Sequence, residues 1–349
     1  MEITGINDIQ ELVVYGFLDW KSLGEVGVDF DGDLAIFNYT PKAQYEGRWN
    51  VFECVSRGLI LNIKTGEVIA RPFDRFWNWL EGGRCSSGHI VNVTEKIDGS
   101  MGTLYRVNGE YHIATRGAFH SEQAEWATKF INANFELHGL PTELTLVFEI
   151  VYPENRIVLD YGNRQDIVLL AARNRFTGEF LPFFPNVYEM AYKYGFSLPR
   201  TFQFNDIVNI IEKTGAMGLE EGEGFVVEFS DGQRFKFKAD RYLELHRLIS
   251  RLSYKSAVLA VFSGNVEEYR QRVPEEFLGD FNGWVLDVEK RMAQIRETIT
   301  EVYGIAPKET RKDFAIWSNK NHRDIAPYLF AMLDNKPIEP LMLRMEFSQ

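Results

Sequence analysis

The chain contains 349 residues, of which 45% are hydrophobic and 25% are charged. This balance is typical of a globular protein, and the length allows two domains of ordinary size. The formal net charge of −12 argues against a protein that coats nucleic acid through counterion release, but it leaves room for a local basic groove. No run of about 18 uncharged apolar residues occurs, so we expect no membrane span. The cysteines, Cys54 and Cys85, are not spaced as metal ligands, and we expect free thiols in a reducing cytoplasm.

Up to about residue 240, short β-type runs alternate with turn signals. The runs 59–63 and 67–70 predict a first hairpin. The runs 102–107 and 110–116 predict a second hairpin, because the intervening Asn108-Gly109 suits a type I′ turn. Further strands are predicted at 145–151, 167–171, 224–229 and 234–238, and helices at 121–133 and 185–194.

After residue 240 the pattern changes. Apolar residues between 242 and 252 recur at helical spacing, and helices are also predicted over 284–303, 313–317 and 325–333. The sequence therefore predicts an α+β domain over residues 1–250, followed by a mainly α-helical domain over residues 251–349.

A lysine in front of a glycine-containing turn is the first candidate for chemistry. Lys96 follows a predicted strand and precedes Asp98-Gly99-Ser100. Taken alone, this segment favours an ordinary solvated loop lysine. The segment Phe235-Lys236-Phe237-Lys238 adds two lysines on one face of a strand, with the phenylalanines facing the core. Two cations aimed at one point suit a triphosphate, although solvated edge lysines are the alternative.

Two glutamates lie in or beside apolar strands. Glu149 sits within the apolar run 144–151, where an unpaired carboxylate is costly, so it needs a hydrogen-bond donor or a cation. Glu223 precedes the apolar run 224–227. It belongs either to a solvated acidic loop or to a Mg²⁺ site.

These segments resemble the motifs of the covalent nucleotidyltransferase superfamily. Lys96-Ile97-Asp98-Gly99 resembles motif I, Phe148-Glu149 motif III, Glu223-Gly224-Phe225-Val226 motif IV and 235–238 motif V, in the superfamily's order. The flanks are similar to the ATP-dependent RNA ligases typified by the tRNA-repairing enzyme of phage T4; they comprise residues 56–60, 70–78, 121–124, 153–158 and 238–246. The resemblance implies an ATP-grasp-like nucleotidyltransferase domain with antiparallel sheets and helices.

The resemblance also implies residue roles. Lys96 receives AMP, while Asp98 completes the motif I turn. Glu149 binds the ribose, and Glu223 supports the metal. Lys236 and Lys238 hold the α-phosphate and stabilise its charge. The other implied nucleotide-pocket residues are Glu95, Ile97, Gly99, Arg57, Arg75, Trp77 and Arg116.

Two positions depart from the family pattern. Arg75 replaces the family's lysine, and it keeps the charge but offers a rigid fork. Trp77 replaces a phenylalanine, and core packing is an equal alternative for this side chain.

The implied reaction has three steps: adenylylation of Lys96 by ATP, transfer of AMP to a 5′-phosphate RNA end, and attack by a 3′-hydroxyl end that expels AMP. Each step needs Mg²⁺, for which Mn²⁺ is an expected substitute. We expect a monomer that acts in RNA repair, including tRNA repair, in the cytoplasm, which for a phage-encoded protein is that of the host.

Three alternatives remain. DNA ligases and mRNA capping guanylyltransferases share motif I, but they carry an OB domain where this sequence predicts helices. A catalytically silent nucleotide- or RNA-binding module is the third. The C-terminal cations either touch RNA or belong to a solvated helical surface; they are Lys308, Arg311, Lys312, Lys320 and Arg323.

Overall fold

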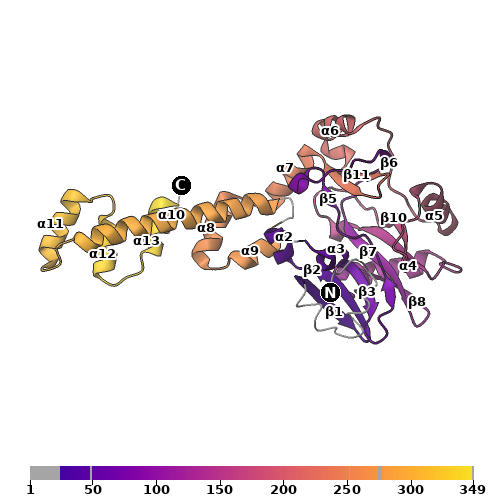
Figure 1. Cartoon of the computed structure of the whole chain (residues 1–349), viewed down its shortest axis with the longest axis horizontal. Helices are drawn as coiled ribbons and strands as arrows, with labels where there is room; N and C mark the ends of the chain where they lie inside the picture. The colour runs from indigo at the N-terminus through magenta and orange to yellow at the C-terminus, as the bar shows by residue number, and fades with distance from the viewer. Residues whose placement is uncertain (1–23, 48, 251, 274–276, 348–349) are drawn as a thin grey trace. The chain divides into compact units, whose positions relative to one another are not determined.

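A computed structural model describes residues 24–347 apart from 48, 251 and 274–276. The chain forms two compact units, Met1–His246 and Arg247–Gln349 (Figure 1). The sequence predicted two domains, residues 1–250 and 251–349. That these parts are separate domains remains a prediction. Within the described residues, no helix is both long enough and apolar enough to cross a membrane.

The first sheet of unit 1 has the strand order β1-β2-β3-β4, with every pair antiparallel. Its strands are β1 (Val26–Asp31), β2 (Leu34–Tyr39), β3 (Arg57–Asn62) and β4 (Val68–Ala70), and the helices α2 (Pro41–Glu46) and α3 (Val51–Val55) follow β2. Alternation along these strands gives the sheet two apolar faces. One face packs around Phe52 of α3, and the other packs against Tyr105 and Phe119 beside the second sheet.

The second sheet has the order β10-β9-β7-β8 and is antiparallel throughout. Its strands are β7 (Ser100–Val107), β8 (Glu110–Ala114), β9 (Leu144–Val151) and β10 (Asp166–Asn174). Asn108 and Gly109 have φ of 52° and 90°, as a type I′ turn requires, and they fix the register of the β7–β8 hairpin. The helices α4 (Glu122–Asn134) and α5 (Tyr188–Tyr194) contribute Ala127, Ile131 and Ala191 to the core on this sheet.

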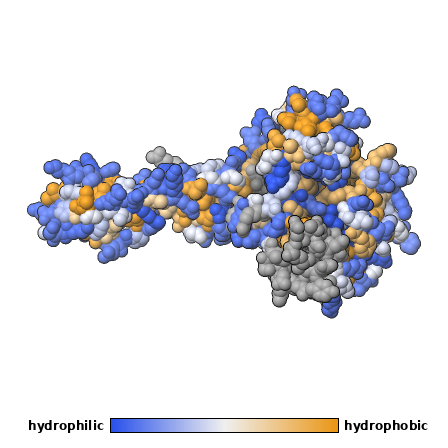
Figure 2. Space-filling model, viewed as in Figure 1, coloured by the Kyte–Doolittle hydropathy of each residue, from blue (hydrophilic) through white to orange (hydrophobic). Residues whose placement is uncertain are grey.

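The third sheet has the order β5-β12-β11-β6. Its strands are β5 (Trp77–Asn78), β6 (Ile90–Glu95), β11 (Gly224–Phe229) and β12 (Arg234–Lys238), and α6 (Ile207–Ala216) packs on it. The predicted antiparallel pairing holds in this sheet except at one edge, where β5 pairs with β12 in parallel. More than 150 residues separate β5 from β12, so no tight turn imposes an antiparallel direction. Hydrophobic residues gather over α6 on the face drawn in Figure 2, where Val208 and Ile211 are exposed.

Short helical segments complete unit 1: η1 (Glu81–Gly83), η2 (Pro153–Asn155), η3 (Phe183–Val187) and η4 (Leu219–Glu221). The predicted helix at 185–194 is regular α-helix only from Tyr188, because its first residues belong to η3, a π-helical segment that contains the extended Phe184 (φ −114°, ψ 131°).

Helices form the described part of unit 2. They are α8 (Tyr254–Ser263), α9 (Val266–Arg272), α10 (Leu278–Ile305), α11 (Arg311–Asn321), α12 (Ala326–Leu333) and α13 (Glu339–Glu346), while α7 (Asp240–Ile249) begins in unit 1. Val288, Phe314 and Tyr328 lie at the centre of the larger apolar cluster. The molecule is therefore an α+β fold with three sheets followed by C-terminal helices, as the sequence predicted at this level.

Candidate active site

A cavity of about 610 Å³ opens in unit 1, and strands of the second and third sheets contribute to its walls. Most of the residues singled out in the sequence line it: Arg57, Glu95, Lys96, Ile97, Gly99, Arg116, Glu149, Lys236 and Lys238. Glu223 contacts two of these side chains directly. Asp98, Arg75 and Trp77 are not among the residues that line the cavity. The structure thus gathers side chains that are up to 181 positions apart in the sequence around one space.

Lys96 belongs to an ion-pair cluster centred on Glu223. Its Nζ is 2.7 Å from Glu223 Oε2, and Lys238 Nζ is 3.2 Å from Glu223 Oε1. The pairing of β6 with β11 creates this arrangement, because Lys96 N donates to Gly224 O at 2.9 Å and Gly224 faces Lys238 on β12. The Glu223 side chain is 2% exposed. A buried carboxylate with two cationic partners avoids the cost that an unpaired buried charge would carry.

The alternation along β12 separates an apolar face from a cationic face. Phe235 and Phe237 are buried in the core of the third sheet. Arg234, Lys236 and Lys238 lie on the other face and line the cavity. This is the two-residue period of a strand with one face in the core.

Glu149 reaches the cavity from the middle of β9. It is partly exposed to the cavity but otherwise surrounded by protein, and burial raises its pKa from 4.5 to about 7. Lys96 and Arg57 oppose this shift, while Glu223 and Asp98 reinforce it. A carboxyl group with such a pKa in a cleft is a marker of functional sites.

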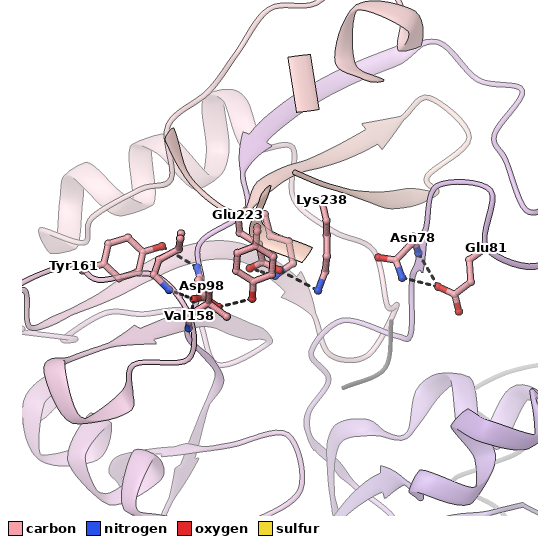
Figure 3. Close-up of polar contacts among 10 residues, drawn as sticks. Asn78, Glu81, Asp98, Val158, Tyr161, Glu223 and Lys238 are labelled. Atoms are coloured by element: carbon pink, nitrogen blue, oxygen red, sulfur yellow. Dashed lines mark hydrogen bonds and ion pairs between the residues drawn. The ribbon is translucent and has the colours of Figure 1, made fainter. Parts of the chain in front are cut away.

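Asp98 is held by protein groups (Figure 3). Its Oδ2 accepts hydrogen bonds from Val158 N at 2.9 Å and Leu159 N at 2.8 Å, and its Oδ1 accepts one from Tyr242 Oη at 2.9 Å. Its own backbone N–H donates to Tyr161 Oη at 3.0 Å. Asp98 is 5% exposed, and these bonds anchor the turn that carries Lys96.

Arg75 and Trp77 form a separate packed cluster. The Arg75 guanidinium lies 3.8 Å from the ring centroid of Trp49 and 4.2 Å from that of Trp77. It also pairs with Glu81 at 2.9 Å, and Glu81 accepts hydrogen bonds from Asn78, as Figure 3 shows. Cation–π contacts and an ion pair therefore account for a nearly buried guanidinium at this position.

The remaining predicted positions have identifiable partners. Glu95 forms a two-point ion pair with Arg200, with distances of 2.9 and 3.0 Å. Arg57 donates to Met101 Sδ, and Arg116 donates to Tyr39 Oη at 3.2 Å.

The sequence interpretation did not identify three residues that matter here: Tyr161, Arg200 and Tyr242. Tyr242 lay within a flanking segment that resembled the ligases, so a signal existed for it. Tyr161 and Arg200 carried no such signal. Tyr161 contacts Asp98 of motif I, and Arg200 contacts Glu95 just before it, only through the tertiary fold.

No group of three or more His, Cys, Asp or Glu side chains that could hold a metal ion occurs in the described part of the chain. Magnesium usually keeps several waters and takes one or two carboxylates plus substrate phosphates. Glu223 fits that limited role, provided that Lys96 or Lys238 releases the Glu223 carboxylate oxygen with which it is paired.

The class of protein follows from comparison with known families. A family model described as RNA ligase, of the T4 type, matches residues 55–242, which include every motif described above. The chain therefore belongs to this RNA ligase family.

Individual relatives agree with this assignment. A bifunctional polynucleotide kinase/RNA ligase of Autographa californica nuclear polyhedrosis virus is 32% identical over 252 residues, which are 63% of this chain and 34% of the viral protein. An RNA ligase of Thermovibrio ammonificans is 28% identical over 206 residues, which are 54% of this chain and 52% of that protein. The chain thus spans about a third and about half of these two relatives.

Solved structures bear on the fold alone. An archaeal ATP-dependent RNA ligase matches 85% of this chain and 83% of its own with a TM-score of 0.51 and 14% identity. A Naegleria gruberi RNA ligase variant with ATP and Mn matches 45% of this chain and 51% of its own, with 21% identity and a TM-score of 0.37.

Proposed function

We propose that this protein is an ATP-dependent RNA ligase that joins 5′-phosphate and 3′-hydroxyl RNA ends through a lysyl-AMP intermediate on Lys96. The observation that carries the proposal is the cluster Lys96–Glu223–Lys238 at the wall of a nucleotide-sized cavity. Family membership supports the reaction class, and the geometry supports the choice of nucleophile.

In the first step, Lys96 Nζ attacks the α-phosphorus of ATP. The N–P bond forms while the bond to the β-phosphate oxygen breaks, and pyrophosphate leaves. Before the attack Nζ gives up a proton, and Glu223 Oε2, which accepts its hydrogen bond at 2.7 Å, is placed to take it. Lys236 and Lys238 stabilise the charge that develops on the α-phosphate oxygens.

The surrounding residues hold the nucleotide. Glu149 is placed to accept a hydrogen bond from a ribose hydroxyl, and Arg57 and Arg116, which also line the cavity, supply positive charge. Glu95, Ile97 and Gly99 line the cavity beside Lys96. A divalent cation, Mg²⁺ or Mn²⁺, would neutralise phosphate charge with Glu223 as its protein ligand.

The later steps use the same cavity. The RNA 5′-phosphate oxygen attacks the lysyl-AMP phosphorus, and the N–P bond to Lys96 breaks. The 3′-hydroxyl of a second end then attacks the RNA phosphate and expels AMP. RNA repair in the cytoplasm, with broken tRNA as one substrate, is the role that the family resemblance suggests. We propose that the protein acts as a monomer.

Incubation with α-labelled ATP or GTP and Mg²⁺ tests the first step. We expect label from ATP to be retained by the denatured protein and lost in Lys96→Ala. Lys129→Ala is the matched control, because Lys129 is an exposed lysine on α4. Label from GTP alone would indicate a capping enzyme, and no label from either nucleotide would refute the enzymatic proposal.

Joining assays test the polynucleotide specificity. We expect 5′-phosphorylated single-stranded RNA or nicked tRNA stem-loops to be sealed, with linear and stem-loop substrates compared directly. Sealing of nicked duplex DNA without sealing of RNA would favour a DNA ligase instead.

A further inference from the structure

A second cavity, of about 700 Å³, adjoins the candidate active site in unit 1. We call it the aromatic groove, and it is lined by residues 90–93, 183, 184, 188 and 198–205. These residues come from β6, from the start of α5 with its preceding segment, and from the chain before α6; β6 and α5 are labelled in Figure 1. Among the described lining residues none is Asp or Glu, although the whole chain carries a net charge of −12.

The groove combines a fixed floor with an exposed aromatic rim. Phe202 and Phe204 pack edge-on against Phe225 of the core, with ring centroids 4.9 and 5.3 Å away. On the rim, Phe184 is 77% and Tyr188 54% exposed, and their ring centroids are 6.1 Å apart. Single exposed aromatics are common, but two neighbours line this cavity. Their planes are inclined by 61°, so each ring offers a separate face on which a flat ligand can stack.

The groove adjoins the candidate active site. Asn92 and Phe183 line both cavities. The two-point ion pair between Arg200, which lines the groove, and Glu95, which lines the first cavity, also bridges them. A polymer whose end reacts beside Lys96 can therefore continue into the groove.

The side chains that line the groove indicate which kind of ligand it binds. The groove offers aromatic faces for stacking and the amide side chains of Asn92, Gln203 and Asn205 for base edges. Its lining cation, Arg200, is engaged by Glu95, so contacts to the phosphate backbone contribute little. An apolar peptide would match the aromatics, but it would leave unexplained both the amides and the position of the groove beside the nucleotide cavity.

We propose that the aromatic groove binds the unpaired nucleotides next to the reacting RNA end, with bases stacked on Phe184 and Tyr188. This inference rests on the proposed function and specifies its substrate: the RNA end must be single-stranded for several nucleotides, because bases already stacked in a duplex cannot stack on these rings. Because few phosphates are neutralised, the affinity should depend only weakly on salt.

Fluorescence anisotropy with a labelled, 5′-phosphorylated single-stranded oligoribonucleotide tests the proposal on the full chain. Removal of one stacking partner typically weakens binding roughly five- to hundred-fold, and we expect an effect in this range for Phe184→Ala and for Tyr188→Ala. Phe184→Trp and Tyr188→Phe should keep near-wild-type affinity. Tyr192→Ala is the matched control, because Tyr192 is 87% exposed on the same helix and does not line the groove.

Lysyl-AMP formation, measured on the same variants, separates this proposal from the proposed function. Normal lysyl-AMP formation with weakened RNA binding supports both. RNA binding that depends on Phe184 and Tyr188 in a protein that forms no lysyl-AMP refutes the ligase but supports the groove. An RNA affinity unchanged in both alanine variants, or no RNA binding by the wild type, overturns the groove as an RNA site, and unchanged affinity would leave it open to an apolar peptide.

Discussion

Glu149 couples protonation to stability at the level of a single residue. Its pKa in the folded protein, about 7, lies above its ordinary value of 4.5. Its favourable contribution to folding is therefore complete below pH 4.5 and is lost as the pH rises through 7. The shift corresponds to about 3 kcal/mol at about 1.4 kcal/mol per pH unit.

We predict that Glu149→Gln removes this dependence. Above pH 8 the variant should be more stable than the wild type by up to about 3 kcal/mol, and below pH 5 the difference should vanish. Urea denaturation at several pH values measures it. Parallel stability curves for the two proteins would contradict the assigned pKa. Adenylylation should fall in the variant, because an amide accepts a ribose hydroxyl less strongly than a carboxylate does.

Tyr242 contacts Asp98, which lies two residues from the proposed nucleophile Lys96. Its hydroxyl is buried and donates to a carboxylate, so Tyr242→Phe should lower the free energy of unfolding by about 1.5–3 kcal/mol. The adenylylation rate should also fall, because Asp98 anchors the turn that carries Lys96. Chemical denaturation and the label-transfer rate provide the measurements, with the exposed Tyr192→Phe as control. A rate and a stability that both match the wild type would show that this hydrogen bond does not position the turn.

At the scale of elements, the β11–β12 hairpin depends on one glycine. Gly224 has φ of +144°, and a Cβ there would collide with the carbonyl oxygen of Phe237 on the partner strand. We predict that Gly224→Ala destabilises unit 1 by more than about 3 kcal/mol and abolishes lysyl-AMP formation. Gly232→Ala in the same hairpin meets open space at φ +79° and should cost only about 1–2 kcal/mol. Thermal unfolding of both variants distinguishes a collision from a general effect of losing glycine.

The elements with a strong local signal were predictable. Alternation and the Asn108-Gly109 turn indicated the β7–β8 hairpin, and apolar periodicity indicated α10 and α12. The hairpin of β1 and β2 was missed, although Asp31-Gly32 at its turn is a legible signal. The parallel β5–β12 pair was not predictable, because a strand of two residues has no periodicity and its partner is set by the tertiary fold.

Within the candidate site, too, local patterns predicted some residue positions and not others. Lys236 and Lys238 share a face by strand geometry alone. The partners of Asp98 could not be inferred in this way, because Tyr161 is 63 and Tyr242 is 144 residues distant. Side chains that support a motif from so far along the chain leave no pattern in a single sequence.

For the whole molecule, the lining of the first cavity lies between Asn38 and Lys238. We therefore predict that a fragment of residues 1–250 folds and forms lysyl-AMP within a few-fold of the full-length rate. Circular dichroism and label transfer from ATP test this, with Lys96→Ala in the fragment as control. A fragment that is folded but takes no label would show that unit 2 contributes to the first step, and the domain division at residue 250 would then need revision as a functional boundary.

The ion-pair cluster around Glu223 has a consequence for how the protein could be observed at work. In the proposed first step, adenylylation converts the Lys96 ammonium, with one positive charge, into a phosphoramidate whose phosphate carries about one negative charge at neutral pH. Glu223 then loses a partner, and the local charge moves by about two units towards negative. The modified and unmodified proteins should separate on isoelectric focusing without any label, so that the position of a band reports the fraction of molecules primed for the next reaction.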